Sequence, residues 1–184
     1  MQGQRTAKLI TTGARARLVR KVELLRKSLR GIGKKKGEAA GEFLSDWHDN
    51  AAYEQLDREF QMTSRRISEM EDLLNGAQSA EVVEQKEKVS IGSTAEVLID
   101  GHENTLTIGC LGESEPDLDL IAYVSPIGRV LMGLREGEVK KGKVGTREVE
   151  VKVIRLHPPS FRYNALQEKL NAALDAEKPA ASEG

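Results

Sequence analysis

Two heptad-spaced runs of residues meet at the stretch Ser45-Asp46-Trp47-His48-Asp49-Asn50-Ala51-Ala52-Tyr53. The first run is Leu18, Val22, Leu25, Leu29, Ile32, Lys36, Ala39 and Phe43, and the second is Tyr53, Leu56, Phe60, Thr63, Ile67, Met70 and Leu74. Matching seams joined by a short link predict an antiparallel coiled-coil hairpin. With roughly thirty residues in each arm, the rod would be about 45 Å long. The hairpin would place residues 45–50 at its tip.

The helix boundaries of this hairpin follow from capping signals. Thr12 is the expected N-cap of a first helix over about 14–44, and Asn75-Gly76 is the stop signal of a second helix over about 50–74. We therefore assign residues 1–76 to the hairpin. The polar and charged residues 77–88 that follow predict a linker.

From Val89 onward the periodicity changes to that of strands. An Asp100-Gly101 turn signal predicts a β-hairpin, a strand follows at 120–124, and 146–156 alternates valine with charged residues. Ser125 and Pro126 have the order of an N-cap and a first helical residue, so a short helix begins there. Gly137 and Gly142 are expected in turns. Residues 89–156 thus predict a small domain with an antiparallel sheet and one short helix, which makes the chain α+β.

The last segment, residues 157–184, is expected to be an extension of that domain. Its apolar residues have helical spacing, and they are Tyr163, Leu166, Leu170 and Leu174. The Ala/Pro/Ser-rich end beyond them has the composition of a disordered tail.

Composition excludes several classes of protein. No apolar run approaches the roughly 20 residues that cross a bilayer, and the basic N-terminus lacks an apolar signal core, so we expect a cytoplasmic protein without membrane contact. The single Cys110 excludes an internal disulfide and a cysteine-based zinc site. We expect it to pack as a small apolar residue in a strand.

The net charge of −1 conceals two blocks of opposite sign. Residues 1–36 hold twelve basic side chains against Glu23 alone, whereas residues 37–88 hold thirteen acidic side chains against five basic ones. The basic strip could pair with acids of the second helix, such as Glu69, Glu71 and Asp72. It could equally be an anion-binding face for RNA or DNA phosphates. The strip comprises Arg15, Arg17, Arg20, Lys21, Arg26, Lys27, Arg30, Lys34 and Lys35. Lys36, at a seam position opposite Phe60, is expected to extend outward.

The tip residues also have two interpretations. Asp46 and Asp49 are good helix caps, and His48 suits a solvated turn. Trp47 has little core to enter at the end of a thin rod, so it either packs locally, contacts a partner or stacks on a base.

Two motifs resemble the bacterial transcript cleavage factors of the GreA and GreB family, and the resemblance extends over roughly residues 8–156. The family tip reads Gly-Asp-x-x-Glu-Asn-Ala-x-Tyr; Asp46, Asn50, Ala51 and Tyr53 match it, whereas Ser45 replaces Gly and Asp49 replaces Glu. The second motif is Ser-Pro-Ile-Ala-Arg-Ala-Leu-Ile-Gly in the family and runs from Ser125 to Gly133 here.

This resemblance implies a C-terminal FKBP-like domain that docks beside the secondary channel of RNA polymerase through Ser125, Pro126, Ile127 and Arg129. The coiled coil would enter the channel, and Asp46 and Asp49 would be the catalytic carboxylates that hold a second Mg²⁺ jointly with polymerase. Trp47 and His48 would make tip contacts, and the basic strip would guide the 3′ end of the nascent RNA. The free protein would be a monomer without a metal of its own. It would be an accessory factor that stimulates polymerase's own RNA cleavage, not an enzyme.

Other functions stay open. Family members with altered acidic tips block polymerase without stimulating cleavage, and the shorter Asp49 fits that alternative. Nucleic-acid binding alone is another. A prolyl isomerase is disfavoured, because its pocket needs several aromatic residues and 89–156 offers only Tyr123.

Overall fold

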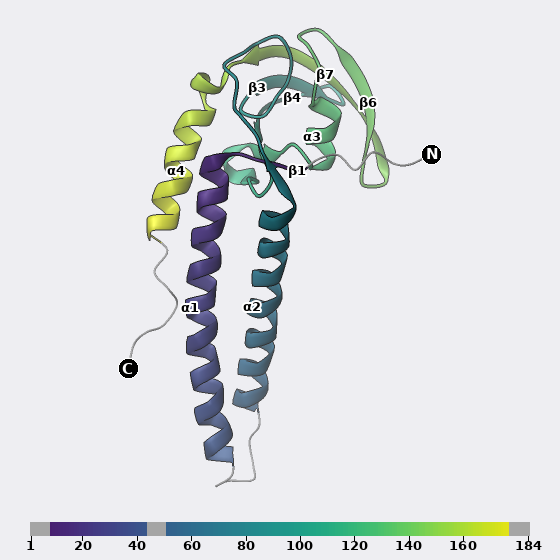
Figure 1. The fold of residues 1–184 in the computed structure, drawn as a ribbon. Coiled ribbons are helices and arrows are strands. Elements are labelled where there is room, and N and C mark those ends of the chain that lie inside the picture. The colour runs from purple at the N-terminus through teal and green to yellow at the C-terminus, as the bar shows by residue number, and fades with distance from the viewer. Residues whose placement is uncertain (1–7, 44–50, 177–184) are drawn as a thin grey trace. The chain divides into compact units, whose positions relative to one another are not determined.

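The computed structural model describes residues 8–43 and 51–176, without the side chains of 41–43 (Figure 1). The chain forms two compact units. The globular unit contains the described residues up to Arg15 together with Ala77–Ala173. The hairpin unit contains Ala16–Gly76, and the described residues from Leu174 onward are grouped with it. The hairpin unit ends at Gly76, whereas the described residues up to Arg15, which we assigned to the hairpin, belong to the globular unit.

The hairpin unit consists of two long helices, α1 (Thr12–Phe43) and α2 (Ala51–Gly76). Leu18, Val22, Ile32 and Ile67 are buried in the seam, whereas most other seam residues are half-buried. Two helices have only one shared face, so neither can be enclosed completely. The predicted helical hairpin is confirmed.

The cap of α1 differs from the prediction by one residue. Thr12 is already helical, and the hydroxyl of Thr11 accepts a hydrogen bond from the amide of Ala14 at 3.2 Å. Thr11 is also buried and lies 3.6 Å from the Cys110 sulfur, measured from its Oγ1. Thr11 and Thr12 are equally good N-caps by sequence. The contact that distinguishes Thr11 is with Cys110, which is distant in the sequence, so the sequence could not reveal it. The α2 helix continues through Asn75 and Gly76, two residues beyond its predicted end.

The structure contains a short pair of parallel strands that the sequence did not predict. β1 (Lys8–Ile10) pairs with β2 (Ala77–Ser79), so residues 77–79 are not part of a linker. The amide of Leu111 donates to the carbonyl of Leu9 at 3.0 Å, which ties β1 to the globular unit. Three-residue strands carry no periodicity that a sequence could reveal.

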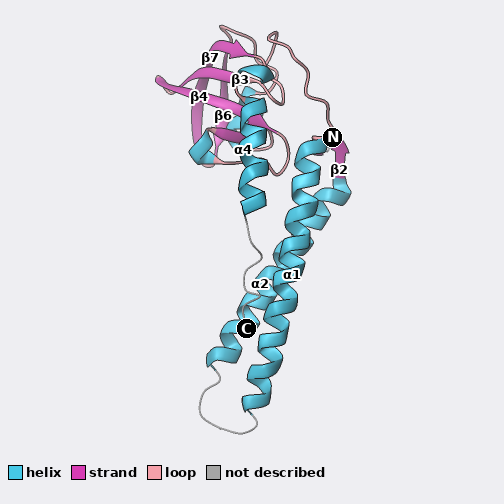
Figure 2. Ribbon diagram, turned by 90° about the vertical axis from the view of Figure 1, so that its left-hand side faces the viewer, coloured by secondary structure: helices cyan, strands magenta, loops and turns pink. Residues whose placement is uncertain are grey.

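The main sheet has the strand order β5-β4-β3-β7-β6 (Figure 2). Its members are β3 (Thr94–Ile99), β4 (His102–Gly109), β5 (Leu120–Ala122), β6 (Val139–Val144) and β7 (Arg147–His157). Asp100 and Gly101 have φ angles of 48° and 85° in the predicted turn between β3 and β4. These two strands and β7 confirm the predicted pattern.

Two features of the sheet differ from the prediction. β5 pairs parallel with β4, so the sheet is antiparallel except at this edge. Gly142 lies inside β6 and not in a turn, and a Cβ there would be only 2.3 Å from Val130 Cγ2. Glycine is therefore required where β6 passes the short helix α3 (Pro126–Leu131).

The core of the globular unit lies between the sheet and α3. Along β7, Val149, Val151 and Val153 are buried and alternate with exposed charged residues. Leu131 of α3 and Ile108 of β4 are fully buried as well. The short 3₁₀ helices η1 (Pro116–Leu118) and η2 (Pro159–Phe161) join the remaining elements.

The C-terminal extension forms the helix α4 (Tyr163–Ala176), as its spacing predicted. Tyr163 and Leu166 are buried and cluster with Leu120, and Leu118 and Leu170 pack against this cluster. The first part of α4 is thus a wall of the globular unit. The tail that we expected to be disordered lies outside the described residues. None of the helices that the structure describes is both long and apolar enough to cross a bilayer.

Candidate functional site

The predicted tip residues Asp46, Trp47, His48 and Asp49 lie outside the described residues. The structure describes the helix ends on either side, because α1 is drawn to Phe43 and α2 begins at Ala51 (Figure 1). Residues 44–50 therefore connect the two helices of the hairpin unit. The roles of the four tip residues stay predictions.

A polar cluster occupies the seam on the tip side of both helices. Lys36 Nζ donates a hydrogen bond to Asp57 Oδ1. The same ammonium group lies 5.2 Å from the ring centre of Tyr53 and 5.5 Å from that of Phe60, within range of cation–π attraction. The hydrogen bond to Asp57 raises the pKa of Lys36, against an opposing effect of desolvation. Lys36 thus lies across the seam, and the prediction that it extends outward is wrong.

The basic strip is partly neutralised. Arg26 Nη2 lies 2.6 Å from Glu71 Oε1 across the two helices, which is the pairing that the charge pattern allowed. Lys34 is 3.8 Å from Glu38 along α1, and Arg20 pairs with Asp175. Arg15 donates to the carbonyl of Ala77 at 2.8 Å.

Other members of the strip keep their charge available. Lys27, Arg30 and Lys35 are exposed, and none of them forms an ion pair with a side chain in 8–40 or 51–176. Lys27, Arg30 and Lys34 follow a spacing of three and four, so they share one face of α1, on which Lys34 also pairs with Glu38. This face is a positively charged surface of the kind that attracts phosphates.

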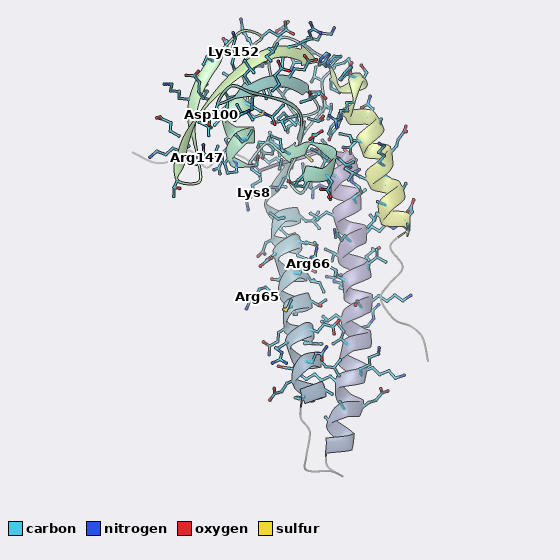
Figure 3. All side chains as sticks on the ribbon, turned by 180° about the vertical axis from the view of Figure 1, so that it is seen from behind. Lys8, Arg65, Arg66, Asp100, Arg147 and Lys152 are labelled. Atoms are coloured by element: carbon cyan, nitrogen blue, oxygen red, sulfur yellow. The ribbon has the colours of Figure 1, made fainter. Side chains whose placement is uncertain are left out.

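On α2, Figure 3 shows Arg65 and Arg66, two basic residues in a mostly acidic helix. Both are exposed. They were not among the predicted nucleic-acid contacts.

The second predicted site is the start of α3. The Ser125 hydroxyl accepts a hydrogen bond from the Gly128 amide at 3.0 Å, which confirms the predicted N-cap. Pro126 and Arg129 are exposed and Ile127 is half-buried, whereas Val130 and Leu131 face the core. The helix therefore presents Pro126, Ile127 and Arg129 at the surface of the globular unit.

Gly128 allows this helix to lie close to the preceding strand. A Cβ at residue 128 would be 2.3 Å from the carbonyl oxygen of Ala122, so the alanine of the family motif would require a backbone shift here.

A cavity of about 500 Å³ adjoins α3 and the turn between β3 and β4. Its lining consists of Ile99, Asp100, His102, Asn104, Ile127, Val144, Arg147 and Val149. Arg147 and Asp100, both labelled in Figure 3, form an ion pair of 3.7 Å. The lining contains no Phe, Tyr or Trp. This composition agrees with the low rank of the prolyl isomerase alternative.

A buried polar cluster in the globular unit was not predicted. Glu113 is only 3% exposed. Its Oε2 accepts hydrogen bonds from the Tyr163 hydroxyl at 2.8 Å and from the Cys110 amide at 2.9 Å. Burial raises the pKa of Cys110 to about 12 and also raises the pKa of Tyr163. Cys110 is fully buried directly after β4, close to its predicted place.

The described residues hold no group of three or more His, Cys, Asp or Glu side chains that could bind a metal ion by themselves. The carboxylates that the sequence nominated for a metal, Asp46 and Asp49, are not among these residues.

Comparison with known proteins gives consistent matches. Residues 84–158 match the family model described as transcription elongation factor GreA/GreB, C-terminal. The transcription elongation factor GreA of Thermomicrobium roseum is 36% identical over 99 residues, which cover 51% of this chain and 62% of that protein. The GreA protein of Nitratiruptor sp. is 30% identical, over 64% of this chain and 74% of that protein. The GreA protein of Nautilia profundicola is 33% identical, over 66% of this chain and 76% of that protein.

Among solved structures, this chain is similar to the GreA factor homolog 1 (Gfh1) of Thermus thermophilus. It has 24% sequence identity and a TM-score of 0.42, over 83% of this chain and 99% of that one.

Proposed function

Because the chain belongs to the GreA/GreB family of transcription elongation factors, we propose that it binds RNA polymerase and stimulates cleavage of backtracked RNA. The observation that carries this proposal is the combination of a long helical hairpin, with two aspartates in its connecting segment, and the family's globular domain in the family's order. Polymerase works in the cytoplasm of bacteria, so this is where the protein would act.

The hairpin unit would enter the secondary channel of polymerase and bring Asp46 and Asp49 to the active centre. Mg²⁺ takes oxygen ligands and is often held by one or two carboxylates together with substrate phosphates. Two aspartates three residues apart fit that donor set, with polymerase completing the site. When bound, a second Mg²⁺ supplies activation of water and charge stabilisation for phosphodiester hydrolysis.

The other predicted contacts have supporting geometry. Lys27, Arg30 and Lys34 share a face of α1 that could guide the negatively charged 3′ end of the RNA toward the tip. Pro126, Ile127 and Arg129 present an apolar and basic surface with which the globular unit could dock on the channel rim. The chain would contribute no active centre of its own, so it would be an accessory factor.

The alternative within the family is a channel binder that modulates polymerase without stimulating cleavage. The observation that favours it is the substitution of the family's Glu by Asp49, which shortens the side chain by one methylene group. Such a protein would still bind and would slow transcription.

Backtracked polymerase complexes test this proposal. Addition of the protein is expected to release short 3′ RNA fragments, and Asp46→Asn combined with Asp49→Asn is expected to abolish release while binding to polymerase persists. The matched control is Glu69→Gln with Asp72→Asn, which removes two charges from α2 away from the tip and should leave release unchanged.

Two results would contradict the cleavage proposal. Slower transcription without fragments would establish the inhibitor alternative. Absence of binding to polymerase would reject both.

A further inference from the structure

The apolar residues of the hairpin unit do not by themselves determine how its two helices are aligned. Its seam repeats every seven residues, so sliding one helix by a heptad again places apolar residues opposite one another. Such a slip displaces the helices by about 10 Å. Among the seam positions of α1, one is charged, and it is Lys36.

The contacts of Lys36 depend on one alignment of the helices. Its ammonium group reaches Asp57 and lies over the rings of Tyr53 and Phe60, at 5.2 and 5.5 Å. Its side chain is 25% exposed and that of Asp57 is 31% exposed, so the pair is partly shielded from water.

The surroundings hold both partners in place. The amide of Gln61 donates to the other carboxylate oxygen of Asp57 at 2.7 Å. On α1, a Cβ at Gly33 would lie 3.5 Å from Phe60 Cε2, an ordinary van der Waals distance, so the Phe60 ring lies against this turn of α1. The partners of Lys36 among the described residues therefore all come from one short segment of α2.

A slipped hairpin would lose the carboxylate but keep apolar contacts. One heptad along α2 from Tyr53, Asp57 and Phe60 are Phe60, Ser64 and Ile67. In this slipped alignment the ammonium group would meet Ser64 instead of a carboxylate in a half-buried seam, and a charge in such a place is unfavourable without a partner.

We propose that Lys36 sets the register of the hairpin: its contact with Asp57 selects one alignment of α1 and α2 among those that the apolar seam permits. A lysine at one seam position is known to specify alignment in coiled coils at some loss of stability. The register itself does not depend on the proposed function. Its effect on RNA cleavage does, because the register decides which turns of α1 and α2 lead into residues 44–50.

The experiment measures the alignment in the full-length chain. Spin labels on Glu23→Cys in α1 and Met62→Cys in α2 report the distance between exposed positions, and the native Cys110 is fully buried. The expected result for the otherwise unchanged chain is one narrow distance distribution. Lys36→Leu combined with Asp57→Leu, which leaves no unpaired charge, is expected to add a second population displaced along the helix axis by about 10 Å.

Two further variants isolate the cause. Lys36→Arg retains the positive charge and should retain the single population. Arg26→Leu with Glu71→Leu removes the other pair that joins the two helices and should also leave one population, because that pair lies outside the seam.

A single unchanged distribution in the Lys36→Leu, Asp57→Leu variant would overturn the proposal. Loss of helix content without a second population would also overturn it, because the pair would then contribute to stability alone. RNA cleavage measured on the same variants should fall in proportion to the slipped population. If the unchanged chain releases no RNA fragments, the proposed function fails, and the distance distributions still decide the register.

Discussion

Each of the two units contains a polar cluster, and the clusters differ in their access to water. In the hairpin unit, Lys36 and Asp57 are 25% and 31% exposed. In the globular unit, Glu113 and Tyr163 are each 3% exposed and Cys110 is fully buried. Breaking a partly solvated pair costs less than breaking a buried one, because water replaces part of the lost contacts, and the remaining cost favours one alignment of the helices. A buried cluster loses much when broken, because its groups have no water to replace their partners.

The largest effect that would test this difference is expected at Glu113. Glu113→Ala removes the acceptor of the Tyr163 hydroxyl and the Cys110 amide and leaves both buried donors unpaired. We expect the free energy of unfolding to fall by about 3 kcal/mol, measured by denaturant titration. Tyr163→Phe, which breaks only one of these bonds, should cost about 1 kcal/mol.

The control for this change is Glu115→Ala, two residues away on the exposed side of the same loop. Its effect should stay within about 0.5 kcal/mol. Equal losses for Glu113→Ala and Glu115→Ala would mean that burial of the cluster does not determine its energetic weight.

A pH-dependent effect is expected at Cys110. The ordinary pKa of 9.0 is raised to about 12 in the folded chain, so the unfolded chain releases its thiol proton first as pH rises. The stabilisation from the neutral thiol is therefore complete below pH 9 and declines between pH 9 and about 12. As pH rises across this range, the free energy of unfolding of the unchanged chain should fall relative to that of Cys110→Ala. Denaturant titrations of both proteins at several pH values measure this difference. Rapid reaction of the native thiol with a thiol reagent below pH 9 would contradict its burial.

The smallest effect is expected at the exposed ion pair of the hairpin unit. Arg26→Ala breaks a 2.6 Å contact with Glu71, but the side chain of Arg26 is 56% exposed. Exposed pairs contribute between 0 and about 1 kcal/mol, so we expect a change of about 0.5 kcal/mol or less in thermal or denaturant unfolding. A loss comparable to that of Glu113→Ala would remove the distinction between the two units.

Much of the fold could be predicted because it depends on local patterns. The heptad spacing from Leu18 to Leu74 contains the two helices, and the Asp100-Gly101 turn contains the β3–β4 hairpin. The cap formed by Ser125 also follows from neighbouring residues alone. The acidic tip motif was identified in the same way, and its residues lie outside the part of the chain that the structure describes.

The candidate site was less predictable wherever a residue depends on a distant partner. The heptad pattern placed Lys36 opposite Phe60, but it did not predict the hydrogen bond to Asp57, because that contact depends on the alignment of two helices. The positions of Glu71 and Asp175 likewise determine which Arg and Lys side chains of the basic strip form ion pairs.

By itself, the sequence determined the helical hairpin, the β3–β4 turn, the α3 cap and the motifs that relate this chain to a family, since each depends on residues within one or two turns or strands. Only the tertiary structure decided the parallel pairing of β1 with β2 and of β5 with β4, and the burial of Glu113 beneath Tyr163. The partners are 69 residues apart in the β1–β2 pair and 50 residues apart for Glu113 and Tyr163, and β5 is a strand of only three residues. Their interaction energy is therefore gained only when the chain has folded.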